Sequence, residues 1–363
     1  MQHFPLFNRF IDIGHAIERF GMEVLRMKGS RKFFLPLLAA PLLALLILSG
    51  CGDTVQTGKE PEPALMQPAV TRHVVFVERS LLEIEDGVLV RYLGDYSRAG
   101  EIVLPAEVRE IAGRAFQLPK KLREQPVGLL ETQKITIPAG VKLQEEAFYG
   151  CGPLEVALEE GREFIEEKAF YECTKYHTRV TVKVPDTVKI ICRHAFDIGH
   201  GGWLRVDLGK GVEILEPYAL QGTYGVSLPD SIREIDKHAL SNWGRIPEGL
   251  PEGVRYLEKH FVDLIQGRLK VPASVRHIAV GAVEWKDEAR KLGYQVDSKN
   301  KNYRSDQNGW LYSKDGKTLY FAYPLNGEDI NIPDSVHTVY MKGLLTKGNK
   351  VKVHGLKRVK RIG

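Results

Sequence analysis

The stretch VKVPDTVKIICRHAF at residues 182–196 decides the fold, because the chain repeats its pattern many times. It begins with an apolar-x-apolar triplet and a proline, continues with a valine and an isoleucine three residues apart, and ends in Ala-Phe. Alternate residues of a β-strand face the same side, so the triplet predicts a short strand with its outer residues buried. Proline has no backbone N–H and ends that strand. One unit has no core of its own, so it must stack on a neighbour.

Eight further copies follow this pattern. The clear ones are IVLPAEVREIAGRAF (102–116), ITIPAGVKLQEEAF (135–148), VALEEGREFIEEKAF (156–170), VDLGKGVEILEPYAL (206–220) and VSLPDSIREIDKHAL (226–240). The weaker ones are GLPEGVRYLEKHF (249–261), LKVPASVRHIAVGAV (269–283) and INIPDSVHTVYMKGL (330–344). The closing residues Phe148, Phe170, Phe196, Leu220, Leu240, Phe261 and Val283 are 22, 26, 24, 20, 21 and 22 positions apart. This period is typical of leucine-rich repeats. Copies 156–170 and 206–220 lack the proline, so we expect local irregularity there.

The copies resemble the bacterial surface leucine-rich repeats of the BspA type, whose pattern is IPxxVxxIGxxAFxxC. Residues 81–105 resemble the hairpin that often precedes such repeats, and residues 294–324 resemble a hairpin module inserted between them. In the second segment, Asp315-Gly316 is a strong hairpin signal. The resemblance implies a mainly β leucine-rich repeat solenoid of parallel short strands with short helical or irregular returns. It also implies a cell-surface protein, and some relatives are adhesins.

The N-terminal region predicts export. A basic stretch precedes the apolar run FFLPLLAAPLLALLILS (33–49), which ends in Leu48-Ser49-Gly50-Cys51. A positive region, an apolar run and small residues describe a secretory signal, with a membrane-spanning helix as the alternative. The ending resembles the lipobox of bacterial lipoproteins, which implies lipidation of Cys51 and membrane anchoring in the bacterial envelope. Met27 is an alternative start that gives a signal of ordinary length.

These features divide the chain into six parts. They are a signal peptide (1–50), a flexible tether (51–70), an N-terminal β-hairpin cap (71–103), leucine-rich repeats (104–283), an inserted β-hairpin module (284–329), and a last repeat with a basic C-terminus (330–363).

Charge gives no sign of nucleic-acid binding. The formal net charge is +5, and the first fifty residues carry six Lys or Arg against three Asp or Glu. The remainder is nearly balanced, whereas a nucleic-acid footprint needs a concentrated basic face. The C-terminal stretch from Lys342 is basic, and we expect a charged terminal strand that blunts a sheet edge; binding of acidic glycans or lipid headgroups is the alternative.

No familiar catalytic motif is present in the sequence, and we predict no enzyme, cofactor or metal site. The glycine-rich segment 198–203 is expected to be a loop, and His194 and His200 are a poor metal pair. Glu145, Glu146, Glu166 and Glu167 lie at variable positions and are expected to face solvent.

Cys151 and Cys173 each follow a closing Phe by three residues, so stacking would superpose them. We expect them to pack as small apolar residues, with a disulfide or metal pair as the alternative. Cys192 is not equivalent to them.

The outward middle positions of the triplets predict a column across one sheet, with a second column two residues earlier. Both columns are mixed polar and lack an aromatic stripe, which suits a protein ligand, with glycan as an alternative. A motif-poor exported enzyme and a structural envelope protein are the competing interpretations. The candidate binding residues are Thr136, Lys183, Arg205, Asp207, Ser227 and Lys270.

Overall fold

The structure is a computed structural model, and Thr71–Gly363 forms one compact unit. The signal segment, the tether and Cys51 lie outside the described residues. The structure describes residues 76–94, 96–199, 202–223, 226–241, 249–265, 268–285, 293–323, 329–344 and 352–362.

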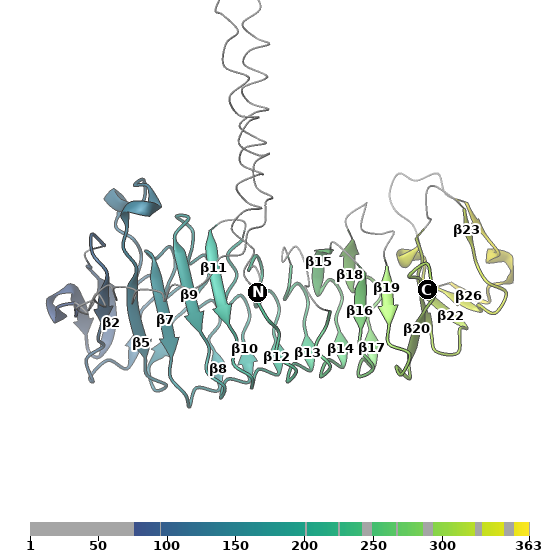
Figure 1. Cartoon of the computed structure of the whole chain (residues 1–363), viewed down its shortest axis with the longest axis horizontal. Helices are drawn as coiled ribbons and strands as arrows, with labels where there is room; N and C mark the ends of the chain where they lie inside the picture. The colour runs from purple at the N-terminus through teal and green to yellow at the C-terminus, as the bar shows by residue number, and fades with distance from the viewer. Residues whose placement is uncertain are drawn as a thin grey trace, which may run out of the picture. The chain divides into compact units, whose positions relative to one another are not determined.

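The described part is mainly β, and parallel strands stack as a solenoid of about 10 turns, which confirms the expected fold class. Two strand systems alternate along the chain, and within each one the strands lie side by side in sequence order (Figure 1). We call the first the long-strand sheet; it contains β3 (Gly100–Ile102), β5 (Gln133–Ile137), β7 (Leu154–Leu158), β9 (Arg179–Lys183) and β11 (Trp203–Asp207). We call the second the return ladder; it contains β4 (Glu110–Ile111), β6 (Lys142–Leu143), β8 (Phe164–Ile165), β10 (Ile190–Ile191), β12 (Ile214–Leu215), β13 (Glu234–Ile235), β14 (Tyr256–Leu257) and β17 (His277–Ile278).

The ends and later repeats carry smaller elements. The further strands are β1 (Leu82–Glu85), β2 (Val88–Tyr92), β15 (Val262–Ile265), β16 (Leu269–Val271), β18 (Val283–Trp285), β19 (Tyr294–Val296), β20 (Tyr303–Ser305), β21 (Leu311–Ser313), β22 (Thr318–Phe321), β23 (Ile330–Asn331), β24 (Thr338–Val339), β25 (Val353–His354) and β26 (Arg361–Ile362). Short 3₁₀ segments are η1 (Arg79–Leu81), η2 (Lys120–Leu122), η3 (Val127–Leu129), η5 (Met341–Gly343) and η6 (Leu356–Arg358).

One repeat shows how the sequence pattern produces this arrangement. β9 buries Val180 and Val182, as the alternation of a strand requires. Pro185 then turns the chain, and the return segment buries Val188 and Ile191. Both inward-facing sets belong to one apolar interior, which only adjacent repeats can close.

Stacked phenylalanines form the centre of this interior. Ring centroids are 4.9 Å apart for Phe116 and Phe148, 4.5 Å for Phe148 and Phe170, and 5.1 Å for Phe170 and Phe196, with interplanar angles of at most 18°. Each ring is at most 1% exposed. Burial of such a side chain contributes about 1.5–3 kcal/mol, so the stack is a major source of stability.

The residue before the buried Ala-Phe or Ala-Leu pair adopts a left-handed backbone conformation. Glu146 has φ of 62° and His194 has φ of 53°. This conformation costs a non-glycine residue about 1–2 kcal/mol. It also points the backbone N–H at the next repeat: Glu146 N donates to Lys168 O at 3.0 Å, and His194 N donates to Pro217 O at 3.1 Å. Inter-repeat hydrogen bonding offsets the local strain.

Phe261 was expected to close its repeat, and this expectation is wrong by one position. Leu240 N donates to Phe261 O just as Leu220 N donates to Ala239 O, so Phe261 occupies the alanine position. Val262 closes the repeat and pairs with Val283. Phe261 is still fully buried, as is Val262.

The return ladder is interrupted between β6 and β8, within the described residues, where the pattern departs from its consensus. Val141 and Leu143 are two residues apart instead of three, and Arg162 stands at the valine position of the next copy. Its Nη2 donates to Val141 O at 2.5 Å, while Glu166 Oε1 accepts from Leu143 N at 3.1 Å. Arg162 Nη1 lies 2.7 Å from Glu166 Oε1, and the side chains are only 5% and 13% exposed.

This ion pair therefore replaces the missing backbone ladder with side-chain hydrogen bonds. It also shows that the expectation of a solvent-facing Glu166 is wrong. Copy 156–170 is irregular on its return side, as its missing proline suggested, whereas β11 of copy 206–220 pairs regularly with β9.

Hairpins lie at both expected places. β1 and β2 pair antiparallel, and β2 joins β4 in parallel. β21 and β22 pair antiparallel around the Asp315-Gly316 turn, and β22 pairs in parallel with β24. The basic C-terminus supplies β25 and β26, and β26 is the outermost strand of its sheet, in agreement with the expected terminal strand.

All three cysteines in the described residues are free thiols. Cys151 and Cys173 are fully buried, and Cys151 Sγ lies 3.5 Å from Cys173 O. Burial raises the pKa of the Cys151 thiol to about 12 and the pKa of the Cys173 thiol well above its ordinary value. Burial of both thiols in neutral form suits the small apolar role that we expected for Cys151 and Cys173.

We expect Phe170→Ala to lower the free energy of unfolding by about 3–5 kcal/mol, because it opens a cavity in the stack. Phe170→Leu should cost only about 1–2 kcal/mol, since leucine occupies the equivalent position in three other repeats. Urea unfolding followed by circular dichroism measures both. Equal losses for the two variants would contradict a stack that depends on filled volume.

Arg162→Val should cost about 3–5 kcal/mol, because it leaves Glu166 buried without its charge partner. Adding Glu166→Gln should recover most of that loss, since the amide oxygen still accepts from Leu143 N. The same urea titration tests both variants. A double variant as unstable as the single one would show that the ion pair has no part in the effect.

Candidate functional site

The outward face of the long-strand sheet is the best candidate for a binding surface. Strands β5, β7, β9 and β11 pair in parallel, so their exposed alternate residues align in columns that cross the strands, with neighbours in one column about 4.8 Å apart. One column contains Thr136, Ala157, Lys183 and Asp207, and the column two residues earlier contains Lys134, Glu155, Thr181 and Arg205.

Four of the six candidate residues therefore lie on one continuous face. Thr136, Lys183 and Asp207 share the first column, and Arg205 lies in the second. Their role in binding stays a prediction.

The other two candidates do not continue that column, so the expectation of one column across one sheet is wrong beyond β11. Ser227 is exposed but lies in residues 226–229, which form no strand. Lys270 lies in β16, which pairs only with β19 among the described strands. The repeat between Leu220 and Leu240 is the shortest, with 20 positions against 24 for the one before it. It therefore has fewer residues to form a long strand.

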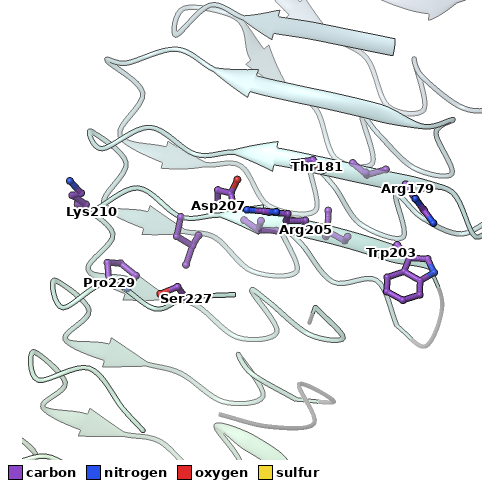
Figure 2. A pocket seen from close by; sticks show the side chains of 12 residues that line it. Arg179, Thr181, Trp203, Arg205, Asp207, Lys210, Ser227 and Pro229 are labelled. Atoms are coloured by element: carbon purple, nitrogen blue, oxygen red, sulfur yellow. Dashed lines mark hydrogen bonds and ion pairs between the residues drawn. The ribbon is translucent and has the colours of Figure 1, made fainter. Parts of the chain in front are cut away.

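A groove of about 970 Å³ lies over β9 and β11, where the sheet ends. Arg179, Thr181, Trp203 and Arg205 line it from the two strands, and Lys210 and Ser227 line its other side (Figure 2).

Trp203 is the most prominent apolar side chain at this groove. It is 67% exposed at the first position of β11 and pairs in register with Arg179 of β9. Neither residue was among the sequence-predicted candidates. Both residues could have been found from the sequence. Arg179 and Trp203 lie two positions before Thr181 and Arg205, and alternate residues of a strand face the same side.

Charge is distributed unevenly along the face. Lys134 Nζ lies 3.1 Å from Glu155 Oε2, which balances the β5–β7 part. In β9 and β11, Arg179, Lys183 and Arg205 face outward against Asp207 alone. Arg205 Nε lies 3.0 Å from Asp207 Oδ1, so this pair is neutral. Because Arg179 and Lys183 add two positive charges, the β9–β11 part is basic.

The histidines take part in packing. His194 Nδ1 lies 2.7 Å from Asp197 Oδ2, and its ring stacks on Tyr218 with centroids 4.6 Å apart. His200 lies outside the described residues, as does part of the glycine-rich loop 198–203. No group of three or more metal-ligating side chains occurs in the part of the chain that the structure describes.

The outward face of β9 and β11 carries cations and one exposed aromatic side chain. These side chains suit reversible binding through charge and apolar contact.

Among the described residues, no helix is both long and apolar enough to span a bilayer. The apolar run 33–49 and Cys51 lie outside those residues.

Comparisons with known proteins identify the repeat type. Residues 128–245 match the model of the BspA type leucine rich repeat region in six copies. No curated protein sequence matches the chain.

Solved structures of bacterial repeat proteins are similar to this chain at low identity. A leucine-rich repeat protein from Eubacterium ventriosum is 23% identical over 58% of this chain and 49% of its own, with a TM-score of 0.32. A leucine rich cell surface protein from Faecalibacterium prausnitzii is 18% identical over 75% of this chain and 67% of its own, with a TM-score of 0.38. The pneumococcal vaccine antigen PcpA is 15% identical over 74% and 61%, with a TM-score of 0.29. The chain thus spans about half the length of the first of these proteins.

The family match covers the segment in which the Ala-Phe and Ala-Leu repeats are clearest. Residues 128–245 therefore carry leucine-rich repeats of the BspA type.

Proposed function

We propose that this chain is a lipid-anchored protein of the bacterial cell envelope that binds another protein through the outward face of its long-strand sheet. The observation that carries the proposal is the groove over β9 and β11, where Trp203 is exposed beside outward-facing cations. Stacked repeats commonly bind partners on the extended surface that their strands create.

The anchor rests on sequence alone. Leu48-Ser49-Gly50-Cys51 follows an apolar run and precedes a proline-containing stretch suited to a tether. Two or three acyl chains satisfy the two-signal requirement for stable membrane attachment. Lipidation of Cys51 and the envelope location are therefore parts of the proposal.

The face itself is suited to binding because its side chains are not needed for folding. Lys134, Thr136 and Lys183 point away from the apolar interior and are exposed. Substitution there changes the surface and leaves the buried stack intact. Catalysis by an unrecognised site has no specific observation in its favour.

We expect Cys51→Ala to abolish incorporation of labelled palmitate when the full-length chain is expressed in bacteria. Cys192→Ala is the matched control and should label normally, since Cys192 lies within the return side of a repeat. Fractionation should move the Cys51→Ala variant out of the membrane pellet. Continued labelling of Cys51→Ala would refute the anchor.

Ala157→Trp should reduce capture of a protein ligand at least about fivefold, because a bulky neutral side chain in the middle of the face blocks close contact. Ala106→Trp is the matched control, since exposed Ala106 lies in the turn after β3. Immobilised full-length chain in detergent is tested against purified extracellular-matrix proteins and envelope extracts.

Circular dichroism must show both variants folded. Equal capture by Ala157→Trp and the parent chain would reject this face as the binding site. Absence of any captured protein would reject the binding function, and turnover of a glycan or peptide would favour an exported enzyme.

A further inference from the structure

Resting on the proposed function, we infer that the segment bound over β9 and β11 is an extended acidic polypeptide that carries an apolar side chain next to its carboxylates. Arg179, Trp203 and Arg205 line the groove, and Lys183 lies beside it, opposite the lining residue Asp207.

Charge complementarity is the first argument. Asp207 is the acidic member of the outward columns of β9 and β11, and Arg205 pairs with it at 3.0 Å. Within the described part of the chain, Arg179 and Lys183 form no ion pair, in contrast to Lys134, which pairs with Glu155. Two outward cations thus remain to meet carboxylates, and complementary charge favours the correct partner over neutral ones.

The spacing of these cations fits an extended chain. Arg179 and Lys183 are the first and last residues of β9 and face the same side. A strand rises about 3.3 Å per residue, so the two positions are roughly 13 Å apart. Two carboxylates four residues apart in an extended peptide are also roughly 13 Å apart and point to the same side. They can therefore meet Arg179 and Lys183 together.

The apolar content of the groove distinguishes a polypeptide from an anionic polysaccharide. Trp203 is 67% exposed and lies one strand from Arg179, while half-buried Leu208 and Pro229 line the same groove. Tryptophan anchors in hydrophobic contacts are typical of protein interfaces. A sulphated or carboxylated glycan can meet the cations and stack one sugar ring on Trp203, but the aliphatic surface of Leu208 and Pro229 suits an apolar side chain. The observations therefore favour a polypeptide.

Fluorescence anisotropy with a labelled peptide tests the inference on the full-length chain in detergent. The probe is Ser-Gly-Glu-Ser-Leu-Ser-Glu-Gly-Ser, in which the central Leu faces the same side as both Glu residues. Its matched control has Gln in place of both Glu residues. We expect the Glu peptide to bind about tenfold more tightly at low salt, with the difference shrinking as salt screens the charges.

Variants then assign the contacts. Arg179→Gln and Lys183→Gln should each weaken binding of the Glu peptide about fivefold, and Trp203→Ala about tenfold. Arg276→Gln removes an exposed cation on the return side and should have no effect. Arg179→Glu combined with Lys183→Glu should reverse the preference toward a peptide with Lys in place of Glu, a gain that misfolding cannot produce.

Three outcomes would overturn the inference: equal binding of the Glu and Gln peptides, no effect of Trp203→Ala, or equally tight binding of a sulphated oligosaccharide of the same charge. These outcomes are separable from failure of the proposed function. If Ala157→Trp still blocks capture of a protein while the Glu peptide fails to bind, the acidic ligand is wrong and the binding face stands. If Ala157→Trp leaves capture unchanged, the face itself is wrong.

Discussion

Each repeat of this protein depends on the next one to satisfy its backbone and its apolar interior. The left-handed residue at each corner illustrates the dependence, because Glu146 N reaches Lys168 O and Lys168 N reaches Arg193 O. These bonds hold Phe148 over Phe170 at 4.5 Å. A repeat without its neighbour would keep the strained corner and lose both the hydrogen bond and the ring contact. Contacts between neighbours, more than the conformation of any single repeat, therefore determine the fold.

The same dependence explains which features of the fold could be predicted from sequence. The strand triplet and the closing Phe or Leu recur in every clear copy, and most of these copies carry the proline. The long-strand sheet and the buried stack could therefore be predicted from the pattern. The return ladder did not, because a two-residue strand such as β10 has no alternation to read. The Arg162–Glu166 pair also escaped prediction, since it depends on one missing residue in the neighbouring repeat. Phe261 was assigned to the wrong position because its size resembles that of a closing residue.

The candidate site was predicted in part for a related reason. Alternation within a strand is local, so the columns through Thr136, Lys183 and Asp207 could be placed from the sequence. The end of the sheet after β11 is not local, because it depends on how a shorter repeat packs against a longer one. The groove and the exposure of Trp203 arise at that junction. The outward face of the sheet could therefore be predicted from the sequence. The groove at its end, where the exposed apolar and basic side chains lie together, could not.

The hairpin module indicates how proteins of this kind can gain or lose repeats in evolution. β22 pairs with β24 through Leu319 and Val339, in the same parallel manner that joins ordinary repeats in the return ladder. The module thus presents a repeat-like edge to the last repeat, although its other strands run antiparallel. A unit with compatible edges can be gained, lost or exchanged without redesigning the rest of the molecule. Gain or loss of a whole module is then less costly than an insertion next to a strained corner, which would break the hydrogen bond from that corner to the next repeat.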